Sequence, residues 1–325
     1  FASYANSAFT FANSELLRKL VAGGIILLFA LVNIWSVRGM GKIEDLLVYA
    51  KLVILAIISF VLINNSQSTL PVLLADNPDS GFLSILIVAS LTFVAYEGFQ
   101  LVIHAMNEIA QPERQLPRAI YSAIVLAVLI YAVISIGAIL AIPFADIVSN
   151  KEYALAAGAG EILGQWGTEL VIIGALLASS SAICGTLFGA SRLMAVIARD
   201  GYFPAIIATR NNTIPVYAVM VMSALAFLLV LLGGLEMIVE FGSVTFLLVS
   251  LLMACANFKM RKQTNSSTTM TVCAMVGLLA GASMIFYYEI NHQPAQLVII
   301  AGLYIALTLT AWLYAKIGSK GIGVT

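Results

Sequence analysis

Nine long apolar runs, separated by short segments with charges or prolines, constrain what this sequence can fold into. A helix that rises 1.5 Å per residue needs about 20 apolar residues to cross the ~30 Å hydrocarbon core of a bilayer. The runs lie at residues 20–37, 45–63, 81–109, 119–142, 169–198, 214–232, 237–258, 269–288 and 296–316. Each is long enough for such a helix, so the sequence predicts an all-α polytopic membrane protein with nine transmembrane helices.

Composition supports lipid as the solvent of this chain. Of its 325 residues, 61% are hydrophobic and only 10% are charged, whereas soluble domains carry about a quarter charged residues. The net charge of zero gives no electrostatic basis for nucleic-acid binding. The three cysteines lie inside apolar runs without CxxC spacing, so we expect them to pack rather than to form disulfides or bind a metal.

Basic residues in the connections predict the orientation. Eleven lysines and arginines fall in connections on one side of the membrane, and three, Arg18, Lys19 and Lys151, fall on the other. Because cytoplasmic connections carry an excess of basic residues, we expect the N-terminus of the chain outside and its C-terminus in the cytoplasm. The short connections favour the cytoplasmic membrane of a bacterium or archaeon.

The run from Gly81 to Ile109 differs from the others. At about 29 residues it is too long for one straight helix across the bilayer, and Glu97 and Gly98 fall near its middle. Irregular backbone at that depth is tolerated only where it is buried in protein or lines a water-filled cavity. A helix broken at the midplane meets this condition and is typical of substrate sites in secondary transporters. One long tilted helix, with Glu97 paired internally, is the alternative.

Polar residues continue beyond the predicted break. On a continued helix, Glu97, His104 and Glu108 would share one face, flanked by Gln100 and Asn107. This stripe indicates a polar lining that leads to the cytoplasm, in which His104 is a candidate proton carrier. The alternative is a histidine that only donates a structural hydrogen bond.

Three segments of the sequence carry recognisable motifs. Residues 93–99 (FVAYEGF) and 107–120 (NEIAQPERQLPRAI) resemble a broken sixth helix and the loop that follows it in permeases of the amino acid–polyamine–organocation (APC) superfamily, with Gln111 where asparagine is usual. Residues 191–204 (SRLMAVIARDGYFP) resemble the loop after their eighth helix. The resemblance covers essentially the whole chain. It implies a secondary transporter of the five-plus-five inverted-repeat (LeuT-like) fold, which carries amino acids or related amines by alternating access.

The same resemblance implies how the chain is divided. Residues 1–80 correspond to the last two helices of the first repeat, residues 81–258 to the complete second repeat, and residues 259–325 to two C-terminal helices. We therefore expect about three further helices before Phe1. One of these would be a glycine-rich broken helix that completes the substrate site.

Substrate-binding residues follow from the resemblance, position by position. They are Phe93, Ala95, Tyr96, Glu97, Gly98 and Phe99. The family binds the substrate's α-amino group through backbone carbonyls of this segment, which implies the carbonyls of Phe93, Ala95 and Tyr96. An aromatic ring, from Phe93 or Phe99, closes over the substrate. Glu97 occupies the position that senses the substrate's side chain and suits a cationic or polar one; alternatively, it bonds only the N–H groups of the break.

Lys51 marks a second candidate site. It lies about two turns into its predicted span and matches a lysine that many family members have where sodium-driven relatives bind an ion. The resemblance implies proton coupling or exchange without sodium, with Ser180 and Ser181 as oxygen partners of the ammonium. Snorkelling of Lys51 to the interface is the alternative. Arg192 either pairs with Glu108 in an inner gate or packs against carbonyls.

Other functions have weaker support in the sequence. No HExxH or GxSxG motif occurs and the chain has two histidines, so we expect no enzyme, no catalytic or metal-binding residues, and no cofactor. An ion channel, a non-transporting membrane sensor and a decayed pseudotransporter are the alternatives to a permease. The expected partners are a small-molecule amino acid or amine and the lipid bilayer.

Overall fold

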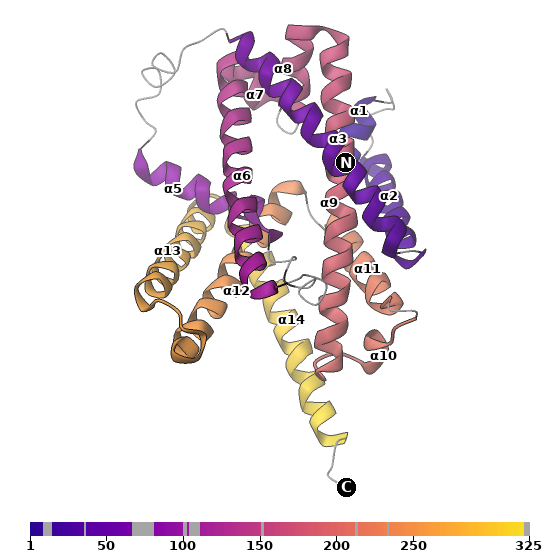
Figure 1. Cartoon of the computed structure of the whole chain (residues 1–325), viewed down its shortest axis with the longest axis vertical. Coiled ribbons are helices and arrows are strands. Elements are labelled where there is room, and N and C mark those ends of the chain that lie inside the picture. The colour runs from indigo at the N-terminus through magenta and orange to yellow at the C-terminus, as the bar shows by residue number, and fades with distance from the viewer. Residues whose placement is uncertain are drawn as a thin grey trace. The chain divides into compact units, whose positions relative to one another are not determined.

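The structure, a computed structural model, is almost entirely helical. It describes residues 1–8, 15–35, 37–66, 81–99, 103, 111–150, 153–211, 214–232 and 234–321. Within these ranges the β-structure is limited to an isolated bridge between Asn211 and Ile214. The prediction of an all-α chain is confirmed (Figure 1).

Long helices alternate with short ones along the chain. The elements are α1 (Ala2–Ala8), α2 (Glu15–Trp35), α3 (Val37–Asn64), α5 (Phe82–Leu91), the 3-10 helix η1 (Phe93–Tyr96), α6 (Pro112–Ala141), α7 (Phe144–Asn150), α8 (Ala154–Leu163), α9 (Gln165–Arg199), α10 (Ala205–Ala208), α11 (Val216–Leu232), α12 (Leu235–Thr264), α13 (Thr268–His292) and α14 (Pro294–Gly321).

Each of the nine apolar runs contains a helix. Seven helices in the described part of the chain, α2, α3, α6, α9, α12, α13 and α14, are long and apolar enough to cross a membrane. The other two runs contain α5, with 10 residues, and α11, with 17 residues. The chain is therefore a multi-pass membrane protein, and the number of nine crossings stays a prediction.

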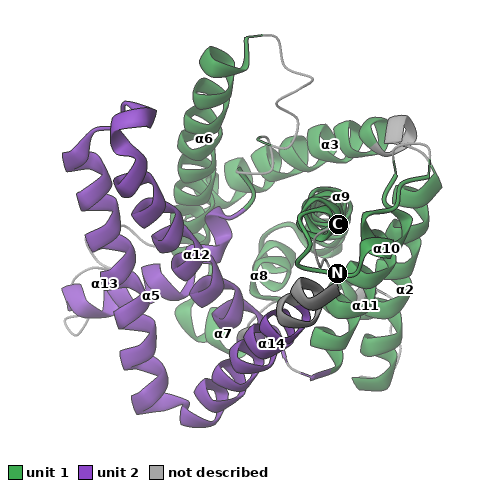
Figure 2. Ribbon diagram, turned by 90° about the horizontal axis from the view of Figure 1, so that it is seen from below, with its two compact units in different colours: residues 1–76, 98–231 green, residues 77–97, 232–325 purple. Residues whose placement is uncertain are grey.

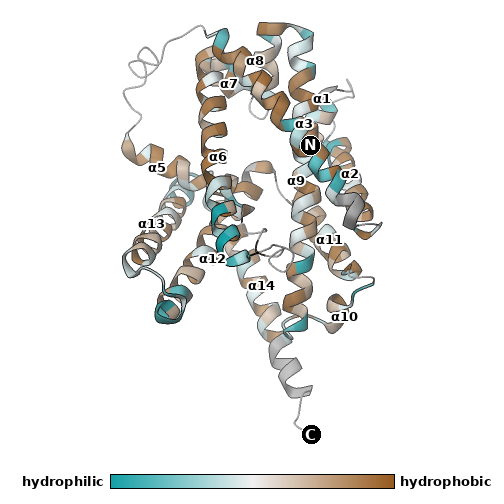
Figure 3. Cartoon of the chain, in the orientation of Figure 1, coloured by the Kyte–Doolittle hydropathy of each residue, from teal (hydrophilic) through white to brown (hydrophobic). Residues whose placement is uncertain are grey.

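Hydrophobic residues predominate along most of these helices (Figure 3), and many large apolar side chains on them are exposed. Leu46 and Phe60 of α3 are 71% and 72% exposed, and Leu252 of α12 is 69% exposed. In water such a surface would be strongly unfavourable, because burial of apolar area drives folding there. In lipid it is the expected outer surface of a bundle.

The described residues form two compact units, each of which we describe by itself (Figure 2). The first comprises residues 1–76 and 98–231. At its centre α3 packs along α9 and against α6. Ile58 and Leu62 of α3 and Val171 of α9 belong to its largest buried cluster.

Two short helices of this unit, α7 and α8, do not correspond to any apolar run. In the chain they follow α6 and precede α9. Helix α8 packs on both α7 and α9. The sequence of α8, ALAAGAGEIL, contains mainly small residues. A search for membrane spans by length and hydropathy does not detect α8, because this helix is too short to cross the membrane.

The second unit comprises residues 77–97 and 232–325. Its helices α12 and α13 are joined by a tight turn, in which Asn265 has a φ of 52° and the Ser267 side chain accepts a hydrogen bond from the Met270 N–H. Val244 and Ile285 belong to the buried cluster between the two helices. Compactness does not test the predicted repeat boundaries, so these stay a prediction.

Candidate functional site

The backbone breaks midway through the predicted third span. Helix α5 ends at Leu91, the chain then forms the 3-10 turn η1, and Glu97 is extended with a φ of −73° and a ψ of 144°. Gly98 follows with a φ of +125°, a conformation that glycine adopts at little cost and other residues rarely adopt. The predicted break is confirmed, and the alternative of one long helix is wrong.

A serine from α12 bonds the backbone of the broken helix at two points. Ser243 Oγ donates a hydrogen bond to the Leu91 carbonyl at 2.6 Å and accepts one from the Val94 N–H at 3.2 Å. Ser243 has no exposed surface. Because an unpaired backbone group is costly where water is absent, this hydroxyl replaces part of the hydrogen bonding that the break removes. Nothing in the sequence distinguishes Ser243 from the other hydroxyl residues of the spans.

The aromatic ring of Phe93 also packs against α12. Its centroid lies 5.4 Å from that of Phe246, and Phe93 packs against the buried cluster of the second unit. In this conformation Phe93 contributes to the packing that holds the break. Whether Phe93 or Phe99 closes over a substrate stays a prediction.

Short turn bonds occupy two carbonyls of the break. The Ala95 N–H donates to the Thr92 carbonyl and the Glu97 N–H donates to the Val94 carbonyl, both at 2.9 Å. The family resemblance assigns the carbonyls of Phe93, Ala95 and Tyr96 to the substrate, but a 3-10 helix from Phe93 to Tyr96 bonds the Phe93 carbonyl within its own turn. The Glu97 side chain is exposed. Substrate binding by these residues stays a prediction.

Lys51 contacts one of the predicted serines in the first unit. Its Nζ donates to Ser181 Oγ of α9 at 3.3 Å, and Ser181 is 3% exposed. Ser179 instead donates to the Ala175 carbonyl of its own helix. Between Ser180 and Lys51, both of them described residues, no hydrogen bond is present. The lysine therefore points into the α3–α9 interface.

A small cavity adjoins the Lys51 side chain. Its volume is about 160 Å³, and apart from Lys51 it is lined by aliphatic side chains, small residues and Tyr4. A charged amine beside an apolar cavity is costly unless it is paired or can lose its proton. This environment suits a residue whose charge changes during function.

Glu44 lies near Lys51, and the hydropathy pattern did not single it out. It lies seven residues, about two turns, before Lys51 and therefore on the same face of α3. Its carboxylate lies against Gly185 of α9, because an alanine Cβ at that position would be 2.6 Å from Glu44 Oε1. Glu44 precedes the apolar run at 45–63, and a carboxylate at the edge of a span is ordinarily interfacial.

The predicted inner gate is only partly described. The Arg192 guanidinium lies 3.3 Å from the Phe188 ring centroid and donates to the Phe188 carbonyl at 3.1 Å. Glu108, its predicted partner, and His104, the candidate proton carrier, lie outside the described residues. The gate and the polar stripe therefore stay predictions.

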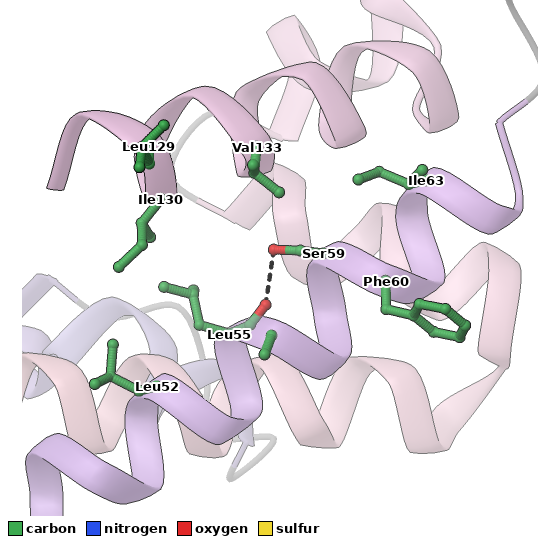
Figure 4. A pocket seen from close by; sticks show the side chains of 9 residues that line it. Leu52, Leu55, Ser59, Phe60, Ile63, Leu129, Ile130 and Val133 are labelled. Carbon is green, nitrogen blue, oxygen red and sulfur yellow. Dashed lines mark hydrogen bonds between the residues drawn. The ribbon is translucent and has the colours of Figure 1, made fainter. Parts of the chain in front are cut away.

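A larger groove between α3 and α6 does not suit an amino acid (Figure 4). Its volume is about 490 Å³ and its nine lining residues contain a single hydroxyl, that of Ser59. This hydroxyl donates to the Leu55 carbonyl of its own helix at 2.8 Å. A zwitterion requires polar partners for both of its charges, so this groove is not the candidate substrate site.

Comparison with known proteins identifies permeases as relatives. Residues 1–320 match the family model described as amino acid permease. The inner membrane transport protein YbaT of Escherichia coli is 28% identical over 305 residues, which are 91% of this chain and 68% of that protein. The branched-chain amino acid permease BcaP of Bacillus subtilis is 27% identical over 214 residues, 63% of this chain and 44% of that protein. Cationic amino acid transporter 4, vacuolar, of Arabidopsis thaliana is 25% identical over 166 residues, 50% of this chain and 27% of that protein.

The contacts of Ser243 predict that its hydroxyl stabilises the protein. Ser243→Ala removes both hydrogen bonds to the broken helix, so we expect the free energy of unfolding to fall by roughly 1–3 kcal/mol. The measurement is thermal unfolding in detergent. Ser283→Ala is the matched control, because the Ser283 hydroxyl is exposed and donates only to the Leu279 carbonyl of its own helix. Equal melting temperatures for the two variants would contradict the prediction.

Proposed function

The chain belongs to the amino acid permease family, and we propose that it moves amino acids or related amines across the membrane by alternating access around the break after Leu91. The observation that carries this proposal is the break itself, with η1, the extended Glu97 and the positive φ of Gly98. Such breaks present backbone groups to a polar solute at the membrane midplane. An ion channel would not require this arrangement.

Backbone groups and Glu97 divide the recognition of the substrate in this proposal. The carbonyls of Phe93, Ala95 and Tyr96 bind the α-amino group, which is common to all amino acids. Glu97 contacts the variable side chain and favours cationic or polar substrates. The names of the relatives include both a branched-chain permease and a cationic amino acid transporter, so the family alone does not choose between these classes and the choice falls to residues such as Glu97.

Lys51 provides the coupling in this proposal. The hydrogen bond to Ser181 at 3.3 Å and the adjacent apolar cavity support a lysine whose ammonium takes the place of a metal cation and can exchange its proton. Transport would then be proton-coupled or an exchange, without sodium. The basic residues of the connections support an N-terminus outside and a C-terminus in the cytoplasm of a bacterial or archaeal membrane.

Uptake by reconstituted protein tests the proposed function. We expect proteoliposomes to accumulate at least one labelled amino acid or amine, and an inward proton gradient to increase the uptake. Protein-free liposomes are the control. If labelled amino acids of the cationic, polar and apolar classes, together with labelled amines, all fail to enter, the proposed function is wrong.

Substitution of Lys51 tests the coupling. In Lys51→Ala we expect uptake to lose its dependence on the proton gradient, because the group that exchanges the proton is absent. Lys42→Ala removes an exposed lysine from the start of the same helix and should leave the dependence unchanged. Uptake in Lys51→Ala with the parental rate and gradient dependence would exclude a coupling role.

Substitution of Glu97 tests the selectivity. Glu97→Gln removes the charge and keeps the shape, so we expect the ratio of cationic to neutral amino-acid uptake to fall by about tenfold, within the ~1.5–3 kcal/mol of a charged hydrogen bond. Glu113→Gln, at an exposed carboxylate in the first turn of α6, is the control. An unchanged ratio in Glu97→Gln would mean that this carboxylate bonds only the N–H groups of the break and does not sense the substrate.

A further inference from the structure

We propose that Glu44 and Lys51 form one proton-binding pair in the α3–α9 interface, in which Glu44 is the member that exchanges the proton with the cytoplasmic side. This inference rests on the proposed function, because it adds a residue to the Lys51 site. It concerns a carboxylate to which neither the family resemblance nor the hydropathy pattern assigns a role.

The two side chains lie on one face of α3 and meet neighbouring turns of α9. Lys51 Nζ contacts Ser181 Oγ at 3.3 Å, and the Glu44 carboxylate contacts the backbone at Gly185, one turn further along α9. An alanine Cβ at position 185 would lie 2.6 Å from Glu44 Oε1, so the carboxylate, as the end of a flexible side chain, would have to move. The absence of a side chain at this position gives the carboxylate its place between the helices.

The charges around Glu44 come mainly from α3. In the part of the chain that the structure describes, Lys51 and Asp45 are the charged groups that act on the Glu44 carboxylate, and the Cys184 thiol of α9 lies within reach of its charge. The other helices packed on α3, namely α6, α2 and α8, add no further charge to it there. Lys51 therefore supplies the positive charge that acts on the Glu44 carboxylate.

A lysine and a carboxylate that share one proton avoid the cost of an isolated charge. A lone buried ion is strongly unfavourable in a membrane, and pairing offsets much of this cost. Lys51 and Glu44, both described residues, do not lie within ion-pair distance of each other, so the proton passes between them through water: an N–H bond of Lys51 breaks, an O–H bond forms on Glu44, and both groups become neutral. The carboxyl group then releases the proton to water or returns it. Glu44 lies nearer the start of α3, the end that the basic residues assign to the cytoplasm.

The pH dependence of uptake tests this pair. In Glu44→Gln the ammonium loses its neighbouring negative charge and releases its proton at lower pH, so we expect the pH of half-maximal uptake to fall by about one unit. Gly185→Ala displaces the carboxylate without changing any charge and should shift the midpoint in the same direction. Glu44→Asp retains the carboxylate and should restore most of the parental profile.

Asp45→Asn is the matched control, because it removes an equal charge from the adjacent, exposed residue; we expect a much smaller shift. If folded Glu44→Gln has the parental profile while the parental uptake depends on pH, this inference is wrong and the proposed function stands. If the parental uptake does not depend on pH, the proton-coupled function and this inference fail together. Should Glu44→Gln not fold, Gly185→Ala decides: a parental midpoint in this variant overturns the pair.

Discussion

In a lipid environment every backbone N–H and C=O needs a partner inside the protein, and the organisation of this chain follows from that constraint. The usual arrangement is that a hydroxyl side chain bonds the backbone of its own segment. Ser59, Ser90, Thr92, Ser179, Ser223, Thr245 and Ser283 each donate to the carbonyl four residues earlier in the chain. Ser243 differs, because its hydroxyl bonds the backbone of another segment. The break can therefore present some backbone groups to a solute while others are bonded from α12.

Hydropathy and two special residues were sufficient to predict the long helices and the break. An apolar run long enough to cross a bilayer has few structures available other than a helix, so the position of each run predicts a helix without reference to its neighbours. The break was predictable because Glu97 and Gly98 are both unfavourable in the middle of a membrane helix and occur together. Helices α7 and α8 were not predictable in this way, because with 7 and 10 residues they are too short to appear as apolar runs of membrane-spanning length.

The partners of the candidate sites were much harder to predict. Lys51 attracts attention in the sequence because a lysine deep in an apolar run is rare. Which serine it contacts depends on the rotation of α9 about its axis, and this follows from packing rather than from hydropathy. The contact is with Ser181, whereas Ser179, two residues away, bonds its own helix. Glu44 and Ser243 are recognisable only from contacts between segments more than one hundred residues apart.

The α3–α9 interface combines tight packing with charge, and our proposal assigns a function to this combination. Helices in membranes associate by close packing of small residues, and an interface that served only this purpose would exclude ionisable groups, which are costly there. At Gly185 the space that a small residue provides holds the Glu44 carboxylate instead of a helix backbone, and the next turn of α9 supplies the partner of Lys51. One lysine, one serine and one carboxylate are the groups on which our proposal of proton coupling rests.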